Sequence, residues 1–186
     1  MKQQEAPSQR PANEPDSPAA TSATGVYAQM VVHPAHLIRR TYQVFLSCFE
    51  MSLGKFDLTP VQWILLATVH DHPGKGIATV ASMAAVDKAS AGRTVARLAD
   101  RGLMHVEQNA RDHRGKMLAL TDAGRTLVAQ VMPSTLALHD DLLAQLSPDE
   151  REIFLAALRI YVERSNDVSR APHLVAPDAV TGDPAG

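Results

Sequence analysis

The sequence predicts one mainly α-helical domain that carries a single short β-hairpin. A chain of 186 residues with 45% hydrophobic content is long enough for one compact core and too short for several large domains. Only 4% of the residues are aromatic, while alanine and leucine are plentiful, which favours helices over a sheet sandwich. Through the middle of the chain, apolar residues recur at steps of three and four, as they do in helices that bury one face.

Both ends of the chain differ from its middle in composition. Residues 1–28 are rich in Pro, Ser, Ala, Gln and Thr and contain almost no large apolar groups, so burial cannot offset the entropy of ordering them. We therefore predict a disordered tail over 1–28, one folded domain over 29–165 and a flexible tail over 166–186. The N-terminus lacks the basic and apolar regions of a signal peptide, and no apolar run is long enough to span a bilayer. A cytoplasmic protein without membrane contact is expected.

Two helices are predicted in the first half of the domain. An apolar stripe that includes Ile38 and Tyr42 predicts a helix over about 34–53. A second helix begins in "LTPVQWILLATV", where Thr59 is a suitable N-cap and Pro60 occupies the first helical position. It ends near "HDHPGKG", where proline and glycine cluster.

Next along the chain, the pattern predicts two short helices and a hairpin. Residues 77–102 form the two helices, with a tight turn around Val86, Asp87 as the N-cap of the second helix and Gly102 at its C-terminal cap. The strand-like segments "LMHVEQ" and "KMLALT" then flank a charged loop, which predicts a β-hairpin. Together these elements make one compact unit over about 57–122, which is called the reading head below.

Two further helices, over about 122–146 and 148–164, complete the domain, and the second opens with the capping pattern "SPDE". They carry more apolar positions than a small reading head can bury. These positions include Leu136, Leu143, Ile153, Leu158 and Tyr161. A partner subunit is therefore predicted to cover them, with the helices at 34–53 and 122–164 forming a helical dimerisation region.

The charge is unevenly distributed along the chain, although the formal net charge is only −2. Residues 86–126 contain eight Lys or Arg and five Asp or Glu, a balance of +3. Residues 133–186 contain four basic and nine acidic residues, a balance of −5. Because salt screens each patch within about 10 Å, the local sign matters more than the total. The first of these segments suits a polyanion and the second does not.

A helix, a turn, a second helix and a basic hairpin, in that order, predict a winged helix-turn-helix that reads double-stranded DNA with its second helix in the major groove. On a helical wheel, Ala91, Val95 and Leu98 face inward, while the outward face holds small residues interrupted by Arg93 and Arg97. Arg93 can reach guanine or phosphate, and Arg97 phosphate. The predicted DNA contacts on this helix are Lys88, Ser90, Arg93, Thr94 and Arg97. A solvated helix face is the alternative.

The charged loop "NARDHRGK" lies where the tip of a wing would be. There Arg111, Arg114 and Lys116 would lie over phosphates or enter the minor groove. Asp112 would repel DNA by itself, so we expect it to pair with Arg114 and hold the guanidinium in one direction. A solvated hairpin turn is the alternative.

The run "DKASAGRTVARLADRGLMHVEQNARDHRGKMLALTDAG" resembles the core of the MarR family of transcriptional regulators. The resemblance includes the Asp-x-Arg of the wing at Asp112 and Arg114 and a Leu-Thr-x-x-Gly turn at Leu120, Thr121 and Gly124. It covers roughly residues 34–164. The resemblance implies a homodimer that binds a palindromic operator and acts as a repressor released by a small phenolic or aromatic carboxylate effector. The long N-terminal tail departs from the family pattern.

Effector residues are expected between the dimerisation helices and the reading head, where the family's ligands bind. An arginine and a histidine near aromatic rings can hold an anionic ring by charge and stacking. The predicted set is His36, Arg40, Tyr42, Trp63 and His70.

Other functions compete with this one. A zinc-responsive regulator would use His33, His36, His70 and His72, but no cysteine accompanies them. A redox-responsive regulator would use Cys48, which we expect to be a buried structural thiol. No phosphate loop, Ser-His-Asp signature or HExxH motif supports an enzyme, and "GKG" at 74–76 is too short. A helical interaction module without DNA binding is the remaining alternative. No catalytic residue, metal or cofactor is predicted.

Overall fold

The computed structural model describes residues 25–108 and 116–173. The chain divides between Arg39 and Arg40, inside one helix, so residues 25–39 and residues 40–173 are described separately. The elements follow the order α1 (Val26–Val31), α2 (Pro34–Leu53), the 3-10 turn η1 (Gly54–Phe56), α3 (Pro60–Asp71), α4 (Ile77–Met83), α5 (Lys88–Asp100), β1 (Met104–Gln108), β2 (Lys116–Leu120), α6 (Asp122–Leu143), α7 (Pro148–Arg164) and the 3-10 turn η2 (Asn166–Val168).

The first unit contains α1 and the start of α2. The composition did not predict α1, whose first residues lie in the segment 1–28 expected to be disordered. Its side chains Val26, Tyr27 and Met30 are exposed. Residues 1–24 and 174–186, which make up most of the two predicted tails, lie outside the described residues.

Most helices begin and end where their capping residues predict. Thr59 and Gln62 form a capping box at α3, in which the Thr59 hydroxyl accepts from the Gln62 N–H at 3.2 Å and the Gln62 amide oxygen accepts from the Thr59 N–H at 2.8 Å. The predicted bounds of α2 and α7 are confirmed. The helix expected to reach residue 146 ends at Leu143, because Leu146 N–H bonds back to Leu143 O at 3.0 Å in a tighter turn.

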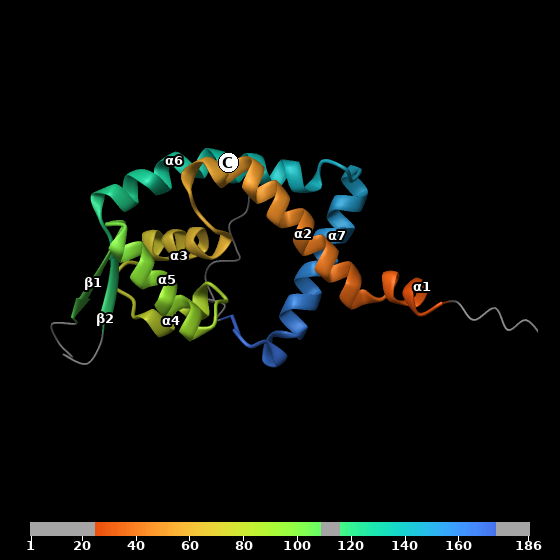
Figure 1. Ribbon diagram of the computed structural model, residues 1–186, viewed down its shortest axis with the longest axis horizontal. Helices are drawn as coiled ribbons and strands as arrows, with labels where there is room; N and C mark the ends of the chain where they lie inside the picture. Colours follow the sequence, from red (N-terminus) through yellow and green to blue (C-terminus); the bar gives the residue numbers. More distant parts are fainter. Residues whose placement is uncertain (1–24, 109–115, 174–186) are drawn as a thin grey trace, which may run out of the picture. The chain divides into compact units, whose positions relative to one another are not determined.

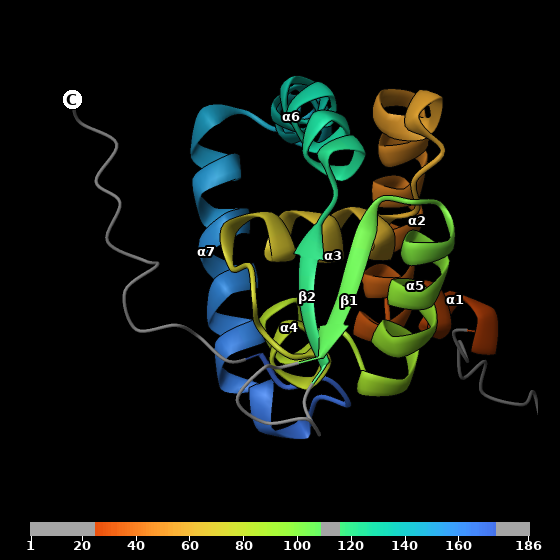
Figure 2. The same cartoon turned by 90° about the vertical axis from the view of Figure 1, so that its left-hand side faces the viewer.

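The hairpin pairs β1 with β2 in antiparallel register, from Met104 opposite Leu120 to Gln108 opposite Lys116. A third segment, which the sequence did not predict as a strand, lines the other edge of β2. Gly74 N–H donates to Leu118 O at 2.8 Å, and Leu118 N–H donates to Lys75 O at 3.0 Å. The "GKG" segment therefore pairs with the outer edge of the two-stranded hairpin through an isolated bridge between Gly76 and Met117, and Figure 2 shows the hairpin with α3 behind it.

One buried core joins the end of α2 to the reading head and to α6. Its fully buried side chains come from α2, α3, α4, α5, β2 and α6: Leu53, Leu65, Leu66, Val69, Val80, Val95, Leu98, Leu118 and Val131. Cys48 is half-buried against this core, so the expected full burial of its thiol is not observed. Helix α7 contributes no buried residue among those described. Its packing within residues 40–173 leaves Ile153, Ile160 and Tyr161 exposed.

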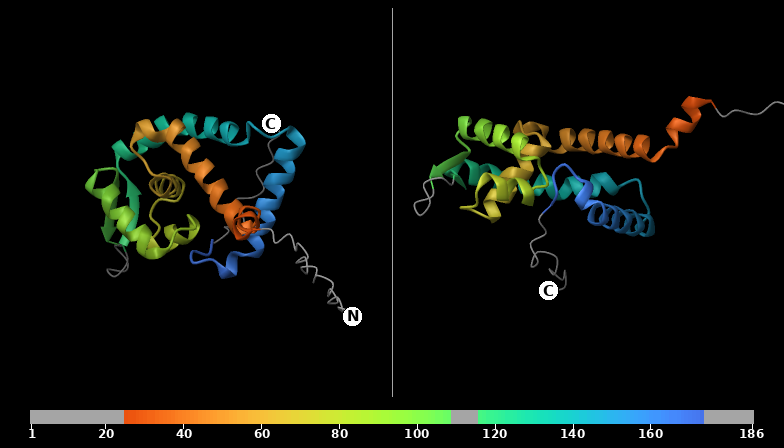
Figure 3. Two further views of the ribbon diagram at one scale, coloured as in Figure 1. Left: turned by 45° about the vertical axis from the view of Figure 1, so that its right-hand side comes forward. Right: turned by 90° about the horizontal axis from the view of Figure 1, so that it is seen from below.

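After α7 the chain returns to the reading head. The Ser82 hydroxyl, in α4, donates to Pro172 O at 3.0 Å. Asn166 closes the returning segment on itself, since its amide oxygen accepts from His173 N–H at 2.8 Å and its amide nitrogen donates to His173 O at 3.4 Å. We call residues 165–173 the C-terminal strap, and Figure 3 shows it running from the end of α7 towards α4. Among the described residues, no helix is long and apolar enough to cross a membrane.

Candidate nucleic-acid interface

The turn between α4 and α5 sets the direction of α5. Ala85 adopts a left-handed conformation, with φ of 50°, which turns the chain sharply. Val86 N–H then donates to Ala81 O at 2.8 Å and closes the turn against α4. Asp87 caps α5 as predicted, because its carboxylate accepts from Ser90 N–H at 2.9 Å. The predicted helix-turn-helix is confirmed.

The far end of α5 is fixed where the wing begins. Gly102 has φ of 70°, and Leu103 N–H donates back to Leu98 O at 2.9 Å. Leu103 and Met104 are buried, so the end of α5 and the start of β1 share the core. Figure 1 shows α5 and the hairpin side by side in the reading head.

The two faces of α5 are those that the helical wheel predicts. Ala91, Val95 and Leu98 are buried. Lys88, Arg93 and Arg97 are exposed, whereas Ser90 and Thr94 are half-buried at the border between the faces. Small residues separate the two arginines from the helix start and from each other, so a partner can approach the α5 backbone closely.

Three side chains of α5 and its cap are linked. Arg93 Nη2 donates to the Ser90 hydroxyl at 2.9 Å, one helical turn nearer to the start of α5. Hydrogen bonds from Ser90, with a smaller contribution from the charge of Arg93, lower the pKa of Asp87 below its usual value. The carboxylate therefore stays ionised beside the arginine.

The wing strands are present, but the tip lies outside the described residues. Lys116 is the first residue of β2. Arg111, Asp112 and Arg114 belong to the undescribed tip, so their DNA contacts and the pairing of Asp112 with Arg114 stay predictions.

Two basic residues of the +3 segment have structural partners that the sequence did not reveal. Arg101 donates from Nη1 to Asp57 O at 2.7 Å, and its Nη2 lies 3.4 Å from the Asp57 carboxylate. Arg125 donates from Nη1 to Leu120 O at 2.8 Å and pairs with Asp122. These contacts anchor α5 to the loop after α2 and β2 to α6. Part of the positive charge that the composition suggests for binding a polyanion is therefore engaged in contacts within the protein.

The predicted effector residues within residues 40–173 differ in their exposure. Trp63 is buried in the core, whereas Tyr42 is exposed and packs its ring against Phe45, with 5.9 Å between centroids. His70 is exposed at the end of α3, where its Nδ1 lies 2.9 Å from the Asp71 carboxylate. Arg40 is exposed on α2. His36 belongs to the other unit, residues 25–39.

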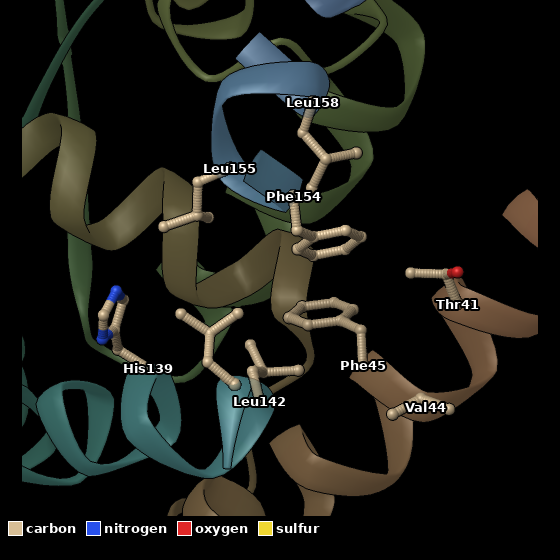
Figure 4. Close-up of a pocket in the computed structure, with 9 residues that line it drawn as sticks. Thr41, Val44, Phe45, His139, Leu142, Phe154, Leu155 and Leu158 are labelled. Carbon is tan, nitrogen blue, oxygen red and sulfur yellow. The ribbon is translucent and has the colours of Figure 1, made fainter. Parts of the chain in front are cut away.

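A different site in residues 40–173 has the chemistry of an aromatic pocket. A cavity of about 260 Å³ lies between α2, α6 and α7. The rings of Phe45 and Phe154 face each other in it, with His139 on one side and Thr41 on the other (Figure 4). The remaining lining residues are Val44, Leu142, Leu143, Leu155 and Leu158. No sequence pattern indicates this cavity, because it depends on how the helices cross.

Metal ligation has no support in the described part of the chain. No group of three or more His, Cys, Asp or Glu side chains there is placed to hold a metal ion.

Comparison with known proteins places this geometry in a family. The model of the MarR family matches residues 58–116. The transcriptional regulator HosA of Escherichia coli is 28% identical over 124 residues, which cover 67% of this chain and 90% of HosA. The HTH-type transcriptional repressor NicR of Pseudomonas putida is 27% identical over 128 residues, which cover 69% and 81% of the two chains.

A solved structure agrees with these relatives. Bordetella bronchiseptica BpsR, whose DNA binding is regulated by 6-hydroxynicotinic acid, superposes with a TM-score of 0.68 and 27% identity, covering 72% of this chain and 95% of BpsR. The matched family model, the named relatives and the arrangement of α4, α5 and the hairpin lead to one conclusion. Residues 58–116 form a MarR-family domain, and the chain has the winged helix-turn-helix fold of MarR-family transcriptional regulators.

Proposed function

We propose that this regulator is a homodimeric repressor that binds a palindromic operator and is released from it by a small aromatic carboxylate. The observation that carries the proposal is the exposed face of α5, on which small residues flank Arg93 and Arg97 beside a hairpin wing. A helix of this kind can approach the floor of the major groove while its arginines reach base edges and phosphates. Lys88 and Thr94 add shorter contacts at the same face, on which the Ser90 hydroxyl accepts from Arg93.

The wing is proposed to contact the DNA beside the major groove that α5 enters. Arg111, Arg114 and Lys116 would contact phosphates or the minor groove, with Asp112 orienting Arg114. If so, Asp112→Ala weakens DNA binding although it removes a negative charge, and the effect disappears when Arg114 is also replaced.

Dimerisation is supported by apolar surface that one chain leaves uncovered. Ile153, Ile160 and Tyr161 on α7 and Leu136 on α6 are exposed by 48% to 69%. Leu143, which the sequence also assigned to a partner interface, is instead buried within its own chain. Two copies would place their α5 helices about one helical turn, ~10 bp, apart on an inverted repeat.

The cavity between α2, α6 and α7 is the proposed effector site. Facing phenyl rings suit a flat aromatic ring, and a ring N–H of His139 can donate a hydrogen bond to a carboxylate. This site differs from the set predicted from the sequence, in which Trp63 is buried. The compound that regulates DNA binding by BpsR, 6-hydroxynicotinic acid, is an aromatic carboxylate of suitable size.

The DNA-binding claim is tested by selecting duplexes from a random pool with the full chain. A palindrome should emerge, and Arg93→Ala should weaken its binding by about 1–3 kcal/mol and relax specificity at the bases it reads. Lys55→Ala, which removes an exposed cation outside α5 and the wing, is the matched control. Failure to enrich any sequence at moderate salt would favour an interaction module without DNA binding.

The effector claim is tested by titrating the operator complex with 6-hydroxynicotinic acid and a series of hydroxybenzoic acids. His139→Ala should bind the operator normally and require more effector for release. Leu142→Trp should fill the cavity and prevent release while sedimentation still reports a dimer. A monomeric Leu142→Trp protein would show instead that the cavity receives the partner chain.

A further inference from the structure

We infer that Ser90 is a positioning residue that holds the guanidinium of Arg93 and links it to the capping carboxylate of Asp87, so that Ser90 sets base specificity without itself reading a base. The inference rests on the proposed function, in which α5 enters the major groove. It assigns to Ser90 a role different from the direct DNA contact that its place on the helix predicts.

The directions of the hydrogen bonds form a chain. Arginine can only donate, so the Ser90 oxygen is the acceptor of the 2.9 Å bond from Arg93 Nη2. The Ser90 hydroxyl proton is then free to be donated, and the Asp87 carboxylate, which already accepts from Ser90 N–H at 2.9 Å, is the acceptor that we assign to it. The lowered pKa of Asp87, to which the Ser90 side chain contributes most, is consistent with that second bond. Donation therefore runs from Arg93 through Ser90 to Asp87.

The geometry favours base readout by Arg93. Ser90 lies one turn nearer to the start of α5, and in helix-turn-helix complexes the start of the recognition helix contacts the base edges. One of five guanidinium N–H groups is used by Ser90, which leaves enough donors for a bidentate contact with guanine. Holding a long, exposed side chain in place before binding also reduces the conformational entropy that binding removes.

Helix α5 contains its own control for this pairing. Thr94 precedes Arg97 by three residues, the same spacing as Ser90 and Arg93. In the described structure, however, the Thr94 hydroxyl makes no hydrogen bond with Arg97. A hydroxyl at this spacing is therefore not sufficient, and Thr94→Ala removes a comparable group from the same helix without releasing an arginine.

The experiment compares wild type, Ser90→Ala, Ser90→Thr, Thr94→Ala, Arg93→Ala and the Ser90→Ala/Arg93→Ala double variant, all as full chains. Each is titrated with the selected operator, with operators carrying single base-pair changes and with random DNA. Thermal unfolding of each variant verifies the fold.

Ser90→Ala should lose roughly fivefold to tenfold discrimination, the size of one net hydrogen bond, at the base pairs where Arg93→Ala also loses it. Binding to random DNA should change by less than about twofold, and Ser90→Thr should restore discrimination. Because Thr94 is itself a proposed DNA contact, any loss of discrimination in Thr94→Ala should fall at other base pairs than these. The double variant should discriminate no worse than Arg93→Ala alone.

Additive losses in the double variant would overturn the inference, because Ser90 would then contact DNA independently. Equal losses on operator and random DNA would overturn it as well, since they indicate a phosphate contact. Wild-type protein that selects no duplex overturns the proposed function and this inference together, whereas the first two outcomes leave the proposed function standing.

Discussion

Gly124 lies in the first turn of α6 against the backbone of the chain that leads into the wing. A β-carbon there would lie 2.0 Å from Leu103 O, which no rotamer change can relieve. Gly124→Ala should therefore lower the free energy of unfolding by about 1–3 kcal/mol, as overpacking does. Urea unfolding checks this, and an unchanged midpoint would contradict it. The contact explains the Leu-Thr-x-x-Gly pattern, in which the Thr121 hydroxyl accepts from Gly124 N–H at 3.0 Å and caps α6.

Gly92 gives the opposite expectation for the same substitution. No atom lies within 4 Å of the position of an added β-carbon, and the residue is inside α5. Gly92→Ala should raise the free energy of unfolding by about 0.5–1 kcal/mol through helix propensity. Because the added methyl group stands on the face proposed to enter the groove, operator binding should weaken. A variant that is more stable and binds the operator equally well would place the DNA on another face.

The capping box at the start of α7 makes the stability of this helix depend on pH. Ser147 N–H and hydroxyl each donate to Glu150 Oε2 at 2.8 Å, and these bonds lower the pKa of Glu150 from its ordinary value. A group with a lowered folded-state pKa contributes stability above its unfolded pKa and loses it as the pH falls through the folded value. The stability advantage of wild type over Glu150→Gln should therefore shrink below about pH 4.5. Urea midpoints at several pH values measure it, with Glu152→Gln as the control for charge alone.

Elements defined by local chemistry could be predicted from the sequence. Thr59, Asp87 and Ser147 cap helices through groups three residues away, so a short window of sequence contains the whole signal. The pairing of residues 74–76 with β2 could not be predicted, because β2 lies far along the chain and glycines beside a lysine are typical of a loop.

In the candidate site, too, some features follow from nearby residues in the sequence and others from tertiary packing. The two faces of α5 follow from helical periodicity alone. The partners of Arg101 and Arg125 depend on tertiary packing, as does the cavity beside His139. The prediction assigns Trp63 to an effector site because the sequence shows that the residue is aromatic but does not show that it is buried.

At the scale of the whole molecule, the C-terminal strap joins the last helix to the reading head. Asn166→Ala removes both hydrogen bonds that close the strap on His173. The free energy of unfolding should fall by about 0.5–1.5 kcal/mol, and backbone amides of residues 165–173 should exchange hydrogen faster. Asp167→Ala, an exposed neighbour in η2, should change neither. Unaltered exchange in Asn166→Ala would mean that the contact between Ser82 and Pro172 alone holds the strap.

The pairing of residues 74–76 with β2 also bears on self-association. Open strand edges are templates for strands of other molecules, and a hairpin that must stay exposed to reach DNA would present two of them. Here β2 is paired on both sides, by β1 and by the segment around Lys75. In the described part of the wing, only β1 keeps an edge that no other strand pairs, and it carries the exposed side chains of His105 and Glu107. A charged, single edge is a poor template for fibres, so the wing can remain accessible in the absence of DNA without making the protein prone to aggregate.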